Sequence, residues 1–134
     1  MFIERFLNKL FAIFRRMSKV IGDLGQREAV IFLEKRGYRI LHQFIRLGHL
    51  EADILAIKDR LLVVVEVKTS TRLFTIEQLI KRISRAQFAR LQAIGSFYVH
   101  RISEVEELRI DLVGVHLNQK NSQVWHLIDI SLYI

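Results

Sequence analysis

Cysteine and proline are both absent from the 134 residues of this chain. Without cysteine there are no disulfide bonds and no thiolate metal sites, and a small secreted domain without disulfides is unusual. Average proline usage of about 5% would give several prolines, and their absence rules out a proline-rich linker. No low-complexity tract or repeat divides the chain. With 51% hydrophobic residues, the length suits one domain with one core.

Acidic residues are scarce relative to basic ones, with 14 against 21 and a net charge of +7. This balance indicates a polyanionic partner, either nucleic acid or an anionic membrane surface, although a basic soluble surface is the alternative. Between Ser70 and Arg101 the only acid is Glu77. The cationic side chains that we expect to follow a phosphate backbone, or else to form a solvated face, are Arg46, Arg72, Lys81, Arg82, Arg85 and Arg90.

The first stretch, MFIERFLNKLFAIFRR, lacks the long apolar run of a membrane span. Its apolar residues recur at helical spacing with basic residues between them. The charges are too frequent for a transmembrane helix, and there is no signal-peptide cleavage site. We therefore expect a cytoplasmic protein without a membrane partner. Three interpretations of the stretch remain open: an extra helix packed on the domain, a surface-seeking amphipathic helix, or a native start at Met17 in place of Met1.

The remaining pattern predicts an α/β layered domain over residues 22–134, with residues 1–21 as a basic amphipathic extension. Asp23 and Gln26 form a capping-box pattern for a helix that Gly37 ends. Alternation and turn residues predict strands over 38–46, 50–57, 61–68, 108–117 and 123–130. Helical sequence covers 76–100 with a break near Ser84. Helix, three strands, helix and two strands is an order typical of α/β layers.

The stretch LLVVVEVKTS, residues 61–70, places an acid and an amine in a strand that otherwise has the pattern of a buried one. Glu66 and Lys68 share one face of that strand, because side chains alternate. A hairpin turn centred between residues 59 and 60 places Asp53 opposite Glu66 and Glu51 opposite Lys68. A slip of one residue would mismatch the apolar pairs, so the pattern favours this register.

Two carboxylates opposite each other on one face repel, and burial increases the cost. The pair is tolerable with a positive group between the acids, either Lys68 or a divalent cation. Oxygen ligands without histidine or cysteine suit Mg²⁺ or Mn²⁺. A structural ion-pair network at the end of a sheet explains the same residues, and spacing alone favours neither interpretation. The five histidines show no metal-ligand spacing, and Asp111 is most simply paired with Arg109 or a helix terminus.

The acids and the lysine resemble the signature of the PD-(D/E)xK nuclease superfamily, here Asp53 followed by Glu66-Val67-Lys68. Together, LGQREAVIFLEKRGYRIL, LEADILAI, LLVVVEVKT and LRIDLVGV resemble the YraN-type bacterial proteins, described as predicted endonucleases distantly related to archaeal Holliday-junction resolvases. The resemblance covers roughly residues 22–130. It implies a restriction-endonuclease-like layered fold with a mixed central sheet flanked by helices. By analogy with resolvases it also makes a homodimer plausible.

The same resemblance implies roles for the site residues. Asp53 and Glu66 would hold Mg²⁺ or Mn²⁺, which lowers the pKa of a bound water and stabilises charge at the scissile phosphate of DNA. Lys68 would orient or activate that water, or stabilise the transition state. Glu51 would be an additional ligand or would orient one.

The chain departs from the family pattern at several positions. In place of the family's Gly-Glu, Asn, Gly, Arg and Lys it has Gly25-Gln26, Phe44, Leu50, Ser70 and Gln87, in that order. Gln26 takes the inward place of the glutamate without its charge, which bears on metal affinity. The other changes bear on phosphate contacts. The leading hypothesis is a metal-dependent endonuclease, and the alternative is a catalytically weak or inactive nucleic-acid-binding protein of the same fold.

Overall fold

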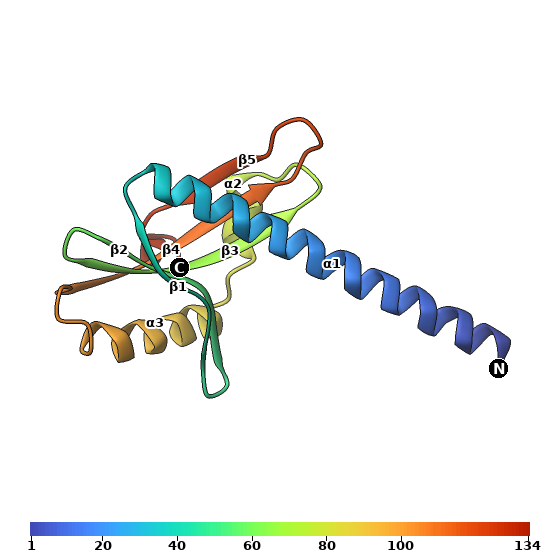
Figure 1. Cartoon of the computed structure of the whole chain (residues 1–134), viewed down its shortest axis with the longest axis horizontal. Helices are drawn as coiled ribbons and strands as arrows, with labels where there is room; N and C mark the ends of the chain where they lie inside the picture. Colours follow the sequence, from blue (N-terminus) through green and yellow to red (C-terminus); the bar gives the residue numbers. More distant parts are fainter.

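The computed structural model describes all 134 residues (Figure 1). A long first helix leads into three strands, two helices, two further strands and a short 3-10 turn. The elements are α1 (Phe2–Lys35), β1 (Arg39–Leu47), β2 (Leu50–Lys58), β3 (Leu61–Ser70), α2 (Ile76–Lys81), α3 (Arg85–Val99), β4 (Glu107–His116), β5 (Gln123–Leu127) and η1 (Ile130–Leu132).

The five strands form one mixed sheet in the order β1-β2-β3-β4-β5. Neighbouring strands are antiparallel except β3 and β4, which are parallel and are joined through α2 and α3. The second half of α1 covers one face of the sheet, and α3 covers the other (Figure 1). The predicted fold class, a mixed central sheet flanked by helices, is confirmed.

Strand β3 is the centre of the core, because both of its faces are covered. Leu62 and Val64 pack into the cluster beneath α2 and α3, whereas Val63 and Val65 pack into the cluster beneath α1. All four side chains are fully buried. A strand buried on both faces has an uninterrupted apolar run, which accounts for the sequence LLVVV.

The predicted strand boundaries and turns agree closely with the structure. The backbone turns through left-handed residues at Gly48 and Asp59, and the register that pairs Leu55 with Val64 is confirmed. The expected break in the helical region is also present, because the Ser84 hydroxyl caps α3 by accepting the Gln87 N–H at 3.0 Å. The last strand is shorter than predicted and ends at Leu127.

The predicted helix start at Asp23 is wrong. Helix α1 runs without interruption from Phe2 to Lys35, and Asp23 is an exposed residue within it. The sequence before Gly22 contains no proline or glycine, so nothing ends the first helical stretch before the second begins. Gly37, with φ of 88°, ends the helix as expected.

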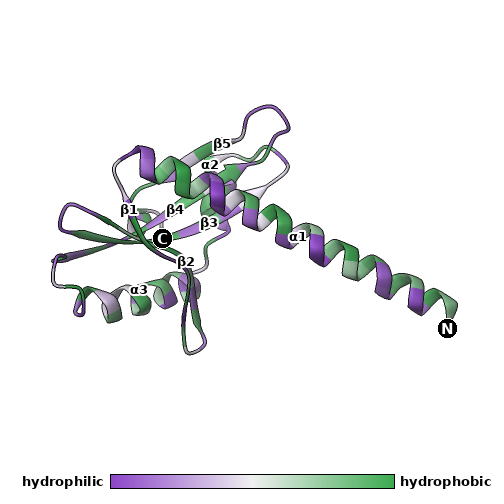
Figure 2. Ribbon diagram, viewed as in Figure 1, coloured by the Kyte–Doolittle hydropathy of each residue, from purple (hydrophilic) through white to green (hydrophobic).

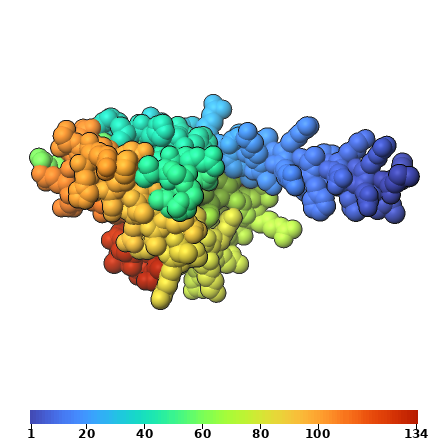
Figure 3. All heavy atoms as spheres, turned by 90° about the horizontal axis from the view of Figure 1, so that it is seen from below, coloured from blue at the N-terminus to red at the C-terminus, as the bar shows by residue number.

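Residues 2–20 of α1 extend away from the sheet into solvent (Figures 1 and 3). Every side chain in this segment except the half-buried Leu10 is exposed. The interpretation of this stretch as a helix packed on the domain is therefore wrong. The stretch is an amphipathic helix whose apolar side chains have no partner in the structure. None of the helices in the structure has an apolar stretch sufficient to traverse a bilayer.

Candidate active site

The candidate site lies where β2 and β3 separate. Their ladder ends at the pair Ile54–Val65, and the next residues along each strand are Asp53 and Glu66. The Val67 N–H donates to Asp53 Oδ2 at 2.7 Å, which orients the aspartate across the end of the ladder. The structure thus brings Asp53 and Glu66 together, as the sequence register predicted.

Glu66 is only 7% exposed. Burial, together with the hydrogen bond and the negative charge of Asp53, raises the pKa of Glu66 to about 9, although Lys68 and the Gln87 amide act in the opposite direction. Gln87 Nε2 donates to Glu66 Oε2. At neutral pH Glu66 therefore keeps its proton in the absence of a cation that would balance the negative charge.

The side chains at the candidate site suit the divalent cation that the family pattern implies. Asp53 and Glu66 present hard carboxylate oxygens, and no group of three histidine, cysteine or acidic side chains gathers anywhere in the chain. Mg²⁺ is commonly bound by one or two carboxylates and keeps several waters. Asp53 and Glu66 line the same cavity, and a divalent cation there would balance their negative charge, so the residues fit the ion.

The Gln26 side chain forms a hydrogen bond to the backbone of Asp53. Its side chain is buried, and Nε2 donates to the Asp53 carbonyl oxygen at 3.0 Å and to Gln43 Oε1 at 3.3 Å. The inward position expected for Gln26 is confirmed. Its amide links α1 to β1 and β2, a contact that a glutamate carboxylate, lacking an N–H, would not make.

Gly25 allows α1 to approach β3 beside the site. A Cβ at position 25 would lie 1.9 Å from Thr69 Oγ1 and within 2.7 Å of two more atoms of that stiff side chain. We expect Gly25→Ala to lower the free energy of unfolding by about 1–3 kcal/mol because the helix must move off the strand. Chemical denaturation measures the change.

Gly22→Ala is the matched control for this prediction. Gly22 lies in the same helix and is exposed, and a Cβ added there would have no atom within 4 Å. Replacing a helical glycine by alanine at such a place is expected to stabilise by about 0.5–1 kcal/mol. Equal effects of the two substitutions would contradict the close approach at Gly25.

Lys68 lies in an open groove of about 520 Å³ between α1 and the end of β3. Asp53 and Arg82 line the same groove, and the Arg82 guanidinium reaches the Thr69 carbonyl oxygen at 3.5 Å. Lys19, from the middle of α1, closes the groove on the other side. The groove is therefore lined by two acids, Asp23 and Asp53, and by three basic side chains.

Glu51 does not take the place predicted for it. The ladder between β2 and β3 ends before Glu51, so the expected pairing with Lys68 is not formed. Its carboxylate instead accepts a hydrogen bond from Arg46 on β1 at 2.9 Å, with both side chains largely exposed. Glu51 borders a second, smaller cavity of about 260 Å³ that Glu66 and Arg90 also line.

The basic residues predicted to contact nucleic acid divide into two groups. Arg82 and Arg90 line the cavities beside the acids, and Arg46 lines a third cavity with Asp53. The others are exposed but line none of these cavities: Arg72, Lys81 and Arg85. Sequence reasoning missed Lys19, because it placed a helix boundary between that residue and the domain.

Phe44 stands out in the sequence only as a departure from the family's asparagine. It lies on β1 in a left-handed conformation with φ of 53°, and the residue is 62% exposed. It lines both cavities that flank Asp53 on the α1 and β1 sides. A left-handed backbone costs a bulky side chain energy but suits asparagine, so this chain keeps an exposed aromatic ring beside the site on strained backbone.

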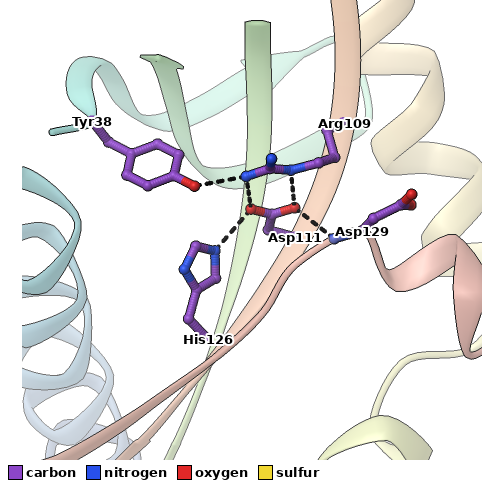
Figure 4. Close-up of polar contacts among 5 residues, drawn as sticks. All are labelled: Tyr38, Arg109, Asp111, His126 and Asp129. Carbon is purple, nitrogen blue, oxygen red and sulfur yellow. Dashed lines mark hydrogen bonds and ion pairs between the residues drawn. The ribbon is translucent and has the colours of Figure 1, made fainter. Parts of the chain in front are cut away.

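A second polar cluster lies beneath α1, away from the candidate site (Figure 4). Asp111 is fully buried and accepts two hydrogen bonds from Arg109, at 2.7 and 2.8 Å, which confirms the predicted partner. His126 Nε2 lies 2.8 Å from Asp111 Oδ2, and the Asp129 N–H donates to Oδ1 at 2.9 Å. Arg109 also donates to the Tyr38 hydroxyl at 2.7 Å.

The Asp111 cluster is closed and lines none of the cavities around Asp53. Burial raises the pKa of Asp111, but the hydrogen bonds from His126, Arg109 and the Asp129 N–H outweigh it, and the pKa lies below its usual value. The carboxylate is therefore held ionised. Its place between α1, β4 and β5 makes it a structural junction rather than part of the candidate site.

The structure thus combines a five-stranded mixed sheet, flanked by helices, with two acids and a lysine at the end where β2 and β3 separate. This is the layered α/β class of fold that the resemblance to PD-(D/E)xK nucleases implies. The chain belongs to the uncharacterised protein family UPF0102, whose model matches residues 25–115. The resemblance to the YraN-type group is thereby confirmed.

Similar proteins extend over most of the chain. A UPF0102 protein of Flavobacterium johnsoniae is 35% identical over 113 residues, which cover 81% of this chain and 91% of the relative. One from Caldicellulosiruptor saccharolyticus is 34% identical and covers 86% and 94%. Among solved structures, Pyrococcus furiosus SfsA in complex with Ca²⁺ shares 15% identity with a TM-score of 0.34, covering 81% of this chain and 62% of that one.

Proposed function

We propose that this protein is a metal-dependent nuclease that hydrolyses phosphodiester bonds in DNA at the groove between α1 and β3. The observation that carries the proposal is the placement of Asp53 and the buried Glu66 beside one cavity at the end of the β2–β3 ladder. Lys68 and Arg82 lie in the adjoining groove. Acids that bind a cation next to cations that bind phosphate are the parts that phosphodiester hydrolysis requires.

Each side chain has a distinct part in this reaction. Asp53 and Glu66 would hold a divalent cation, which supplies Lewis acidity toward the phosphate and lowers the pKa of a bound water. Lys68 stabilises negative charge that develops on the phosphate oxygens. Arg82 and Lys19 hold the neighbouring phosphates of the strand. Water adds across one P–O bond and leaves a phosphate monoester and a hydroxyl group.

The test is a cleavage assay with Mg²⁺ or Mn²⁺ on single-stranded, duplex and branched DNA. The parent should cleave at least one substrate, EDTA should stop the reaction, and Asp53→Ala and Lys68→Ala should each abolish it. The exposed residues Glu104 and Lys120 provide control substitutions to alanine that should retain cleavage. No cleavage by the parent, or equal cleavage by the site variants, would refute the enzymatic proposal.

A non-catalytic DNA-binding protein is the second candidate, and the Gln26 contact favours it. The amide donates to the Asp53 carbonyl and adds no charge near the acids. Such a protein would bind DNA with a strong dependence on salt, because basic side chains release counterions from the phosphates. Salt-sensitive binding without Mn²⁺-dependent cleavage would select this candidate over the nuclease.

Phe44 provides a prediction about the nucleic-acid strand. An exposed ring beside Asp53 is placed to stack on an unpaired base, and such stacking contributes about 1–3 kcal/mol per base. Phe44→Asn should therefore weaken binding of single-stranded DNA by about tenfold or more. It should also stabilise the fold by about 1 kcal/mol, because asparagine tolerates the left-handed backbone. Fluorescence anisotropy and thermal unfolding measure the two effects.

The control for Phe44 is His42→Asn, on the same strand, exposed, and without a left-handed backbone. It should change neither DNA affinity nor stability appreciably. If Phe44→Asn weakens duplex and single-stranded binding equally, stacking on an unpaired base is not the role of the ring.

A further inference from the structure

The extended part of α1, residues 2–20, exposes an unusual amount of apolar side chain. Phe2 is 87% exposed, and Phe6, Phe11 and Phe14 are each about 60% exposed. Contiguous exposed apolar side chains on a protein surface mark sites of interaction. These residues precede the segment matched by the family model, which begins at residue 25.

The apolar and basic side chains of residues 2–20 occupy opposite halves of the helix. At about 100° per residue, the phenylalanines fall with the neighbouring leucines and isoleucines within roughly half of the circumference. The other half carries Arg5, Lys9, Arg15, Arg16 and Lys19, with Glu4 as the only acid. Figure 2 shows hydrophobic and hydrophilic residues interspersed along the whole extension.

The domain itself does not cover this apolar face. In the second half of α1 the buried side is formed by Gly25, Gln26, Ala29 and Leu33. That side is turned about 100° around the helix from the centre of the apolar face of residues 2–20. The side of α1 that packs on the sheet is therefore not the side that carries the phenylalanines. Another partner must cover their rings.

We propose that residues 2–20 dock on the surface of an anionic lipid bilayer, with the phenylalanine face in the boundary between headgroups and acyl chains. A wide apolar face opposite a lysine- and arginine-rich polar face is typical of helices that lie in the membrane interface. Anionic headgroups balance Arg5, Lys9, Arg15 and Arg16 while the hydrocarbon covers the rings. A single partner, the anionic bilayer, thus covers the apolar half of the helix and neutralises the basic half.

Two other candidate partners, a second copy of the helix and a nucleic acid, each suit only one half of the helix. A second copy of the helix would cover the rings, but it would bring two strongly basic helices together, and a coiled-coil seam is narrower than this face. Nucleic acid would neutralise the basic half but would leave the phenylalanines in water. The charge pattern and the width of the face together favour the lipid surface.

The position of the helix gives this docking a consequence for the candidate site. Residues 2–20 span about 28 Å, and the same uninterrupted helix continues to Lys19 and Gln26 at the groove. A bilayer that holds the extension would therefore hold the groove next to it. The sequence alone led us to expect no membrane partner, and the exposure of the helix changes that expectation.

The experiment is flotation of the full chain with vesicles of phosphatidylcholine alone or mixed with phosphatidylglycerol at 7:3. The apolar variant replaces Phe6, Phe11 and Phe14 by serine, and the basic variant replaces Arg5, Lys9 and Arg16 by glutamine. The matched control replaces Asn8 and Ala12, on the polar half, by serine. All these residues are exposed, and circular dichroism together with thermal unfolding checks that the domain remains folded.

The parent and the control should bind the anionic vesicles and leave the neutral ones largely unbound. The basic variant should lose roughly a hundredfold in partitioning, at about tenfold for each one to two charges. The apolar variant should lose at least as much. Light scattering of the vesicle-free protein is recorded in parallel.

Three results would overturn the proposal. The first is no binding of the parent to anionic vesicles above the background of the neutral ones. The second is unchanged binding by the apolar variant. The third is a parent dimer that the apolar variant converts to a monomer, which would identify a second copy of the chain as the partner of this face.

Discussion

Asp111→Ala is expected to lower the free energy of unfolding by about 3–5 kcal/mol. The carboxylate is fully buried and ties together Arg109, His126 and the backbone at Asp129. Its removal leaves the Arg109 guanidinium, whose side chain is only 21% exposed, without its ionic partner. A buried charge that loses its partner keeps its desolvation cost without compensation. Thermal unfolding should show a fall in Tm of about 10 °C or more.

Glu104→Ala is the matched control for Asp111→Ala. Glu104 also pairs with an arginine, Arg39, at 2.6 Å, but both side chains are more than half exposed. Exposed pairs contribute about 0–1 kcal/mol, so this variant should unfold close to the parent. An Asp111→Ala protein within about 1 kcal/mol of the parent would show that the buried cluster does not hold the fold together.

Glu66→Gln is expected to stabilise the metal-free protein at pH 8 by up to about 5 kcal/mol. Folded Glu66 keeps its proton up to about pH 9, whereas the unfolded residue releases it near the ordinary pKa of 4.5. Between these limits the folded state binds more protons, so the free energy of unfolding falls as pH rises. Glutamine mimics the protonated acid, because its oxygen accepts from Gln87 and its amide donates to Asp53.

The measurement is denaturant unfolding in EDTA at half-unit steps from pH 5 to pH 9. The parent should lose stability across this range with a slope of up to about 1.4 kcal/mol per pH unit, and Glu66→Gln should be flatter. Glu51→Gln alters an exposed acid beside the same cavity and should keep the parent's slope. Parallel profiles for the parent and Glu66→Gln would mean that Glu66 ionises normally in the folded protein.

Much of the sheet was predictable because its signals are local. Alternation and the turns at Gly48 and Asp59 give the strands of the first two hairpins, and the apolar pairs give the register that brings Asp53 to Glu66. The placement of Glu51 was wrong for a reason that sequence pattern does not contain. Strands twist and part at their ends, and the ladder stops before Glu51.

Contacts between distant elements were the least predictable part of the site. The Asp53 carbonyl accepts a hydrogen bond from Gln26, which lies on α1, 27 residues earlier in the chain. Asp111 contacts His126 on the last strand, in addition to Arg109. Histidine and tyrosine in apolar segments carry no signal of the charge they will meet. The start of α1 was missed because a capping box is a local pattern, which an uninterrupted run of helix formers overrides.

The strand order has a consequence for how the chain folds. Strands β1, β2 and β3 join through short turns, so their pairing closes only small loops. The parallel joining of β4 to β3, and the bond from Arg109 to Tyr38 across 71 residues, close long ones. Contacts that close long loops form slowly. We therefore expect the β2–β3 hairpin, which carries Asp53 and Glu66, to form early. Burial of Asp111 then completes the native state.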